Sequence, residues 1–282
     1  MQPPDLESLR LLRNNIPLDD FCGLTPNEMH HLLCDTFGKK SPIQIQKDVS
    51  DEVLYTVPFL RLTEEYIKMI EREDQVKLTP KGALPRKVID ELYGHRLILE
   101  DAIESRIVKL TRMTDSVVIT SLFINTGLAG LTKTRRGRLS VTKEGAKCLL
   151  QGQRNDLFHR TVQSFTSTFN WGNNDGFGQH PTGQLGWGYT VYLLTRFGDQ
   201  RQTMQFYADK YLKAFPKLID YFTPPIVGSP QEQFTACYAL RTFDRFLDWF
   251  GFVDVEPHRH TANRSTVQLT RSETLAMVFQ VS

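Results

Sequence analysis

Hydrophobic positions along the chain recur mainly at spacings of three and four residues, the period of an amphipathic helix. This pattern predicts a short helix over residues 6–12 and a second one that begins at Thr25-Pro26-Asn27-Glu28. In that tetrapeptide the threonine is an N-cap, the proline takes the first helical position and the glutamate completes a capping box. Alternation at Ile43 and Ile45 instead predicts a strand.

One junction, a short strand followed by a hydroxyl residue and then a helix, occurs three times. It reads VKLTPKGALP at residues 76–85, LSVTKEG at residues 139–145 and, more loosely, VQLTRSE at residues 267–273. A helix is predicted over residues 61–73 before the first copy, and Pro85 starts the helix after it. The repetition indicates a building unit used more than once.

The second copy has the clearest surroundings. Helices are predicted near Leu97–Lys109 and over Asp115–Thr126, the latter with Gly127 as its C-terminal cap. A hairpin follows over residues 128–141, with its turn at Arg135-Arg136-Gly137, where glycine suits a positive φ. Thr142 then caps a further helix.

Between the second and third copies the pattern is helical and rich in aromatic residues, apart from a loop of glycine and asparagine over Asn170–Gly188. Ser229-Pro230-Gln231-Glu232 is another capping box and starts a long helix. Strands are predicted at Phe252–Glu256 and Thr266–Leu269, and Thr270 with Glu273 starts the last helix, which includes Phe279.

The expected fold class is α+β, mainly α, built from repeated units with small β-hairpins and an all-helical insertion. The expected segments are an N-terminal helical segment (1–50), a first unit with a degenerate hairpin (51–96), a second unit (97–152), an aromatic helical insertion (153–228) and a third unit (229–282).

Composition narrows the function classes only a little. The chain has 282 residues, of which 40% are hydrophobic and 23% are charged, a composition typical of folded proteins and not of disordered ones. A net charge of +2 does not by itself indicate nucleic-acid binding, which must be argued from local clusters. The four cysteines are scattered, and the sequence shows neither a signal peptide nor an apolar run of membrane-spanning length. We therefore expect a cytoplasmic protein with reduced thiols and no membrane association.

The segment ITSLFINTGLAGLTKTRRGRLSVTKEGAKCLL resembles the hairpin and following helix of the winged-helix superfamily, as found in MarR-like and PadR-like transcription regulators. The tandem arrangement is also similar to a group of uncharacterised bacterial proteins related to a plasmid open reading frame. The resemblance covers about half the chain. It implies that Asp115–Thr126 is the helix that enters the DNA major groove and that the hairpin is the wing.

Carried over by position, the resemblance implies a set of DNA-contacting residues. These are Lys133, Arg135, Arg136, Arg138, Asn125, Arg112 and Lys143, with Lys147 nearby. Two features depart from the pattern. Asp115–Thr126 contains no arginine or lysine, and Asn125 is its one side chain of a type that commonly reads base edges. The first unit also has almost no room between Glu73 and Val76 for a first wing strand, which favours a structural or dimerising role for that copy.

Three other polar clusters are candidate metal or ligand sites. His258 and His260 form an H-x-H pattern that fits a zinc half-site, a second phosphate-binding hairpin or a plain exposed loop. His30 and Cys34 are four residues apart on a helix and make half a site at most. The loop from Asn170 lacks the features of a calcium or phosphate loop. Two interpretations remain: a site for a ligand or peptide, and a tight loop anchored by its aromatic residues. We expect no metal and no cofactor.

The leading functional hypothesis is a non-enzymatic, regulatory or nucleic-acid-binding protein that contacts double-stranded DNA through the basic hairpin. The alternative is a protein-interaction scaffold, with a protein partner or a homodimer and no nucleic acid. An enzyme is the weakest hypothesis; a cleft that gathers Asp175, His159 or His180 would favour it.

Overall fold

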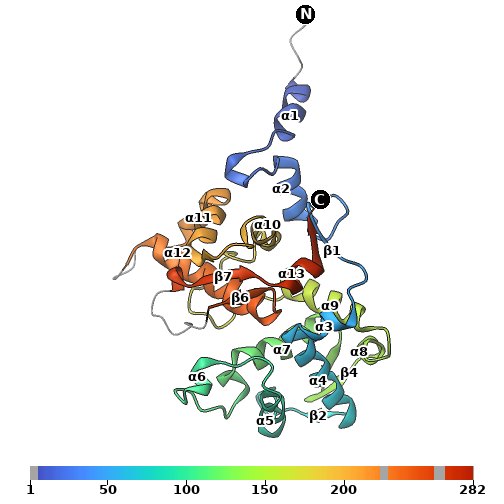
Figure 1. The fold of residues 1–282 in the computed structure, drawn as a ribbon. Coiled ribbons are helices and arrows are strands. Elements are labelled where there is room, and N and C mark those ends of the chain that lie inside the picture. Colours follow the sequence, from blue (N-terminus) through green and yellow to red (C-terminus); the bar gives the residue numbers. More distant parts are fainter. Residues whose placement is uncertain (1–5, 223–227, 257–263, 282) are drawn as a thin grey trace, which may run out of the picture. The chain divides into compact units, whose positions relative to one another are not determined.

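The computed structural model describes residues 6–222, 228–256 and 264–281 (Figure 1). It is an α+β structure, mainly helical, with small antiparallel sheets. The chain divides into two compact units. The central unit comprises residues 47–170, and the flanking unit comprises residues 1–46 together with residues 171–282.

The central unit is built on α4, whose buried face carries apolar residues at helical spacing and packs against α5, α7, α8, α9 and β4. Its sheet is antiparallel, in the order β2-β4-β3. The elements of this unit are α3 (Asp51–Tyr55), α4 (Pro58–Arg72), β2 (Val76–Lys77), α5 (Arg86–Gly94), α6 (Asp101–Glu104), η2 (Met113–Asp115), α7 (Val117–Leu128), β3 (Thr132–Arg135), β4 (Arg138–Val141), α8 (Lys143–Cys148) and α9 (Arg154–Ser167).

The flanking unit has a core rich in stacked aromatic rings, centred on Tyr211, Tyr238 and Phe234. Its elements are α1 (Leu6–Asn14), η1 (Asp19–Phe21), α2 (Pro26–Cys34), β1 (Ile43–Ile45), α10 (Trp187–Phe197), β5 (Gln202–Thr203), α11 (Met204–Ala214), η3 (Pro216–Tyr221), α12 (Pro230–Tyr238), the π-helix η4 (Ala239–Leu247), β6 (Val253–Val255), η5 (Arg264–Thr266), β7 (Gln268–Arg271), α13 (Glu273–Val278) and β8 (Phe279–Val281).

Both units contain a three-stranded antiparallel sheet with the same strand order. The second sheet is β5-β7-β6, so in each case the last strand of the hairpin lies in the middle and pairs with an earlier strand. The surrounding order is also shared: a helix, the first strand, further helices, the hairpin and a final helix. The amide of Leu78 donates to Gly137 O at 2.9 Å, and the corresponding amide of Met204 donates to Val267 O at 3.0 Å.

The helix before each hairpin ends in the same way. Gly130 has a φ of +70° and Gly251 a φ of +67°, a conformation that glycine adopts without steric cost. The next residues, Leu131 and Phe252, are fully buried, and each amide donates to the carbonyl five residues earlier. The predicted cap at Gly127 is therefore wrong, because α7 continues to Leu128 and its left-handed residue comes later.

The final helix of each copy begins at a hydroxyl residue that fastens it to the hairpin. The amides of Thr142 and Ser272 donate to the carbonyls of Leu131 and Phe252 at 2.9 and 3.1 Å. The hydroxyls of Thr142 and Ser272 donate to the carbonyls of Gly130 and Gly251, each at 2.6 Å. Each hydroxyl also accepts a hydrogen bond from the amide three residues further along the chain. The predicted cap Thr142 is confirmed, whereas Ser272, not Thr270, is the cap of the last helix.

The predicted segment boundaries need correction. The predicted boundary at residue 96 separates the strand at Val76 from the hairpin, but β2 and β4 pair in one sheet. The predicted insertion (153–228) is divided between the two units and includes β5. The three predicted units are thus two copies of one arrangement.

Several predicted elements also change in extent. Only α6 forms in the expected helix Leu97–Lys109, where Arg106 has a φ of +61°. Phe279 leaves the last helix and starts β8, which pairs with β1, so the N-terminal segment belongs to the flanking unit. The capping boxes at Thr25 and Ser229 and the helix start at Pro85 are confirmed.

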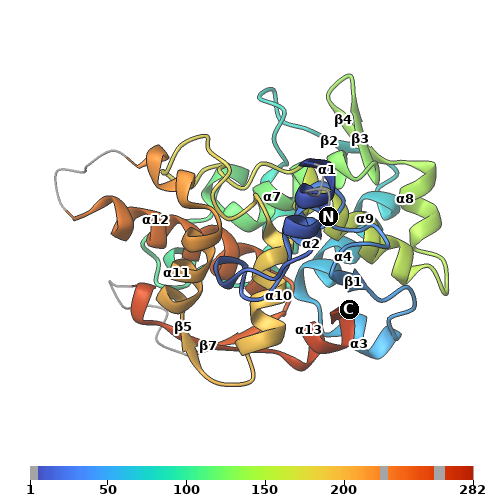
Figure 2. The same cartoon turned by 90° about the horizontal axis from the view of Figure 1, so that it is seen from above.

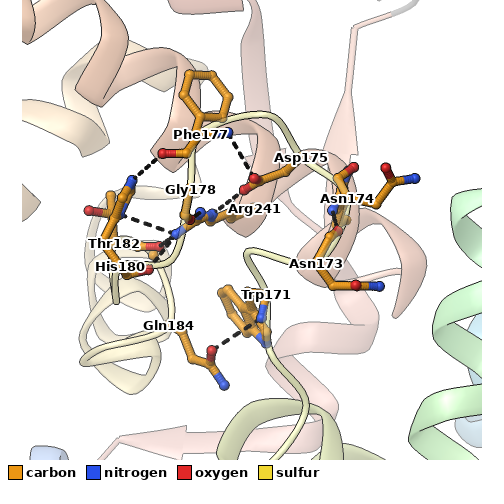
Figure 3. Close-up of polar contacts among 12 residues, drawn as sticks. Trp171, Asn173, Asn174, Asp175, Phe177, Gly178, His180, Thr182, Gln184 and Arg241 are labelled. Atoms are coloured by element: carbon orange, nitrogen blue, oxygen red, sulfur yellow. Dashed lines mark hydrogen bonds and ion pairs between the residues drawn. The ribbon is translucent and has the colours of Figure 1, made fainter. Parts of the chain in front are cut away.

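The loop from Asn170 closes around one buried arginine on the π-helix (Figure 3). Arg241 Nε pairs with Asp175 Oδ2 at 2.5 Å, and neither side chain has any exposed area. The guanidinium also donates to the carbonyls of Gly178, His180 and Thr182 at 2.8, 2.6 and 3.2 Å. This fully bonded buried charge explains how a glycine-rich segment holds one conformation.

His180 completes the same network in its neutral form. Its Nε2 lies 3.0 Å from Phe177 O, so that nitrogen carries the proton and Nδ1 accepts from Arg241 at 3.3 Å. Burial and the neighbouring guanidinium both lower the pKa of His180. Asp175 and His180 do converge, but the Asp175–Arg241 pair is closed to solvent, and His159 belongs to the other unit.

We predict that Thr142→Ala and Ser272→Ala each lower the free energy of unfolding by roughly 1–2 kcal/mol, since each removes a helix cap. Hydrogen exchange in a urea series measures this. The first variant should destabilise residues 131–148, and the second residues 252–256 and 268–278. Thr134→Ala, an exposed hairpin position, is the control and should stay within about 0.5 kcal/mol. Equal effects of both cap variants on both segments would contradict the assignment of two separate units.

Arg241→Ala should cost about 3–5 kcal/mol, because it leaves the Asp175 carboxylate buried without its partner. Limited proteolysis should then cleave the chain within residues 171–184. The double change Arg241→Met with Asp175→Asn removes both charges and should recover part of the loss. A double variant no more stable than Arg241→Ala would show that the ion pair does not fix this loop.

Candidate nucleic-acid interface

The β3–β4 hairpin of the central unit ends in a tight two-residue turn. Arg136 and Gly137 have φ values of +50° and +70°, the combination of a type I′ turn. Figure 2 shows the hairpin standing out from the helices of its unit. The predicted hairpin is confirmed, although its first strand runs from Thr132 to Arg135 and its turn is Arg136-Gly137 alone.

Cations line the solvent face of this sheet. Arg138 on the middle strand lies opposite Lys77 on one side and Arg135 on the other. Directly paired residues point to the same face, and alternation along β3 adds Lys133 to that face. All four side chains are exposed, and Arg136 extends the set at the turn. Lys77 was missed in the sequence, because its neighbours are brought together only by the β2–β4 pairing.

Like charges directly opposite each other destabilise a sheet. Among the residues that the structure describes, none of these four cations forms an ion pair that would offset the repulsion. The central unit carries 20 Lys and Arg against 16 Asp and Glu, a net charge of +4, whereas the flanking unit carries 14 against 16, a net charge of −2. The row is therefore an electrostatic site suited to an anion that spans several cations.

The other predicted contacts differ in their surroundings. Lys143 and Lys147 are exposed on α8, next to the hairpin. Arg112 is also exposed, but its guanidinium pairs with Asp115 at 3.0 Å, so its charge is already compensated.

Asn125 does not face solvent, which corrects the interpretation of this residue as a base-reading side chain. It is 0% exposed, and its Nδ2 donates to Thr161 O on α9 at 3.3 Å. Its backbone carbonyl accepts from the hydroxyl of Ser164 at 3.3 Å. Asn125 therefore links α7 to α9 through hydrogen bonds within the core.

The outward side of α7 is apolar. Phe123, Ile124 and Leu128, together with β3 and Leu139 of β4, line an open groove of about 430 Å³. Leu128 is 47% exposed. We call this feature the α7 groove. It offers no hydrogen-bond donors or acceptors from α7 side chains of the kind that distinguish base pairs.

The equivalent sheet of the flanking unit has a different charge. When Gly130 is aligned with Gly251 and Thr142 with Ser272, Lys133 and Arg135 correspond to Asp254 and Glu256. The strand registers then match Lys77 with Thr203. The shared topology therefore carries cations in one copy and neutral or acidic groups in the other.

In the described part of the chain, no three His, Cys, Asp or Glu side chains gather closely enough to hold a metal ion together. Cys34 Sγ lies 3.7 Å from His30 Nδ1, so the two side chains considered as half a metal site at most are close together. His258 and His260 lie outside the described residues. Within the same described ranges, no helix has the length and hydropathy needed to cross a membrane.

Asp115 gives the interface a testable pH dependence, because it fixes the segment that leads into α7. Its carboxylate accepts from the amides of Thr111 and Arg112 at 3.0 and 2.8 Å. Burial alone would raise the pKa of Asp115, but these bonds and the Arg112 guanidinium bring it well below the usual range.

The unfolded chain therefore binds the proton first, near pH 4, so this stabilisation is complete above about pH 5 and is lost as the pH falls further. Asp115→Asn should reduce protection of residues 111–128 in hydrogen exchange at pH 7 and flatten its fall between about pH 5 and 2. Asp101→Asn, an exposed carboxylate, is the control. A pH dependence identical to that of the wild type would overturn the role of Asp115.

No protein-family model matches this chain, and no match appears among curated proteins or among solved structures.

Proposed function

We propose that residues 47–170 are a winged-helix unit that binds double-stranded DNA without catalysis, using the β3–β4 hairpin as its wing. The observation that carries the proposal is the unpaired row of Lys77, Arg138 and Arg135 across the sheet, with Lys133 on the same face. The order helix, strand, helices and hairpin supports the winged-helix assignment.

The size of the row favours a polyanion. Neighbouring strands are about 4.8 Å apart, so three cations in register span roughly 10 Å. A single carboxylate or phosphate cannot neutralise all of them, whereas a nucleic-acid backbone presents a series of charges. Arg136 at the turn extends the row outward, where a wing meets the backbone or a minor groove.

The proposed binding depends on phosphates and not on base sequence. Phosphate contacts set affinity and position, while base edges set specificity. The exposed side of α7 presents Phe123, Ile124 and Leu128, which lack the polar groups that read bases, and Asn125 is buried. We therefore expect similar affinity for duplexes of unrelated sequence.

The test is fluorescence anisotropy with duplexes of random sequence over a salt series. The wild-type protein should bind with an affinity of about 10⁻⁴–10⁻⁶ M, falling as salt rises. Arg135→Ala with Arg136→Ala should weaken binding to all sequences alike and reduce the slope of log K against log salt by about 2.

Lys39→Ala with Lys40→Ala is the matched control, since it removes two adjacent exposed cations from the flanking unit. This variant should bind like the wild type. Binding that is absent, independent of salt or reduced equally by both pairs of substitutions would refute the proposal and favour the scaffold alternative.

A further inference from the structure

The first strand of the central sheet leads the chain to the same end of the sheet as the hairpin turn. β2 is antiparallel to β4, and its last residue, Lys77, lies opposite Arg138, the first residue of β4. The next amide, that of Leu78, donates to Gly137 O in the hairpin turn at 2.9 Å. The residues that follow Leu78 therefore leave the sheet beside the tip of the hairpin.

These residues form a second tight turn over residues 79–83, which we call the lysine turn. The amides of Thr79 and Gly82 donate to the carbonyls of Ala83 and Thr79 at 2.9 and 2.8 Å. The Thr79 hydroxyl also accepts from the amide of Ala83 at 3.1 Å. The leucine before the turn and the leucine after it are both buried. Because its two ends are bonded to each other and anchored in the core, the turn presents the exposed Lys81 from a fixed position.

The lysine turn has no counterpart in the flanking unit. The strand registers match Leu78 with Met204, which is already the first residue of α11. In the central unit residues 79–85 lie between the equivalent position and α5, which begins at Arg86. The additional segment therefore belongs to the copy whose sheet carries the cations, and it follows the strand at the end where Arg136 extends their row.

Lys81 is the cation of this region whose charge is left uncompensated. The next cation, Arg86, has its Nε 3.3 Å from an Asp90 oxygen. Lys87 has its Nζ 3.8 Å from a Glu73 oxygen. Lys81 forms no ion pair within the part of the chain that the structure describes. An unpaired lysine, on a fixed turn beside a row of like charges, suits contact with a further phosphate of the same backbone.

We infer that the lysine turn is a second DNA-contacting element, in which Lys81 binds a backbone phosphate beyond those bound by the row on the sheet. The inference rests on the proposed DNA binding and adds to it the course of the backbone. Lys81 follows the end of β2, and Arg136 lies at the tip of the hairpin, at the same end of the sheet. The inferred backbone therefore crosses this end of the sheet, between the β2 side and the hairpin.

The test is the anisotropy salt series on the full-length protein with a duplex of random sequence. Lys81→Ala should reduce the slope of log K against log salt by about 1, the loss of one phosphate contact. Lys81→Arg keeps the charge and should bind with the slope of the wild type. Hydrogen exchange over residues 76–84 should be the same in all three proteins, because the Lys81 side chain makes no bond that closes the turn.

Lys68→Ala is the matched control. Lys68 is an exposed lysine of the same unit, so its loss changes the net charge equally, but it lies on α4 and pairs with Glu65 at 2.9 Å. This variant should keep the slope of the wild type. A wild-type protein that does not bind DNA would overturn both proposals. Binding that depends on Arg135 and Arg136 but is unchanged by Lys81→Ala, or is reduced equally by Lys68→Ala, would overturn the role of the lysine turn alone.

Discussion

The pairing of β2 with β4 is the contact on which the central unit depends. It joins two segments more than sixty residues apart, Val76 with Leu139 and Lys77 with Arg138. Closing so long a loop costs conformational entropy, which the buried side chains of Val76 and Leu139 and the helices behind them must offset. Because side chains alternate, burying those two residues forces Lys77 and Arg138 outward on the same face. The charged site is thus a direct consequence of the core.

The two units show how one arrangement has taken on different chemistry. Both end the helix before the hairpin at a left-handed glycine, bury the next residue and bond it to a hydroxyl cap. The glycine, the buried residue and the hydroxyl cap fix the backbone conformation at this point, and both units have them. Exposed positions are free of that constraint, and there the copies diverge, with Lys133 and Arg135 in one and Asp254 and Glu256 in the other.

The helix that precedes the hairpin differs between the two units in geometry and in the polarity of its side chains. In the flanking unit it has a π-helical stretch and carries Arg241 and Arg245, whose bonds hold a loop of the same unit. In the central unit α7 is a regular helix with an apolar outward side. In the flanking unit, the polar side chains of this helix are thus hydrogen-bonded within the unit itself. In the central unit the cationic sheet and the apolar side of α7 are exposed, and the cationic sheet is the surface proposed to bind DNA.

The sequence by itself determined the local structure. The caps at Thr25, Thr142 and Ser229 and the turn at Arg136-Gly137 follow from rules that act within a few residues, so they could be predicted. It could not show that Val76 pairs across the chain, that Asn125 faces α9 or that Arg241 is fully buried. Those outcomes depend on which surfaces meet when distant segments pack. The periodicity and spacing of residues along the chain do not show which distant segment a given surface will pack against.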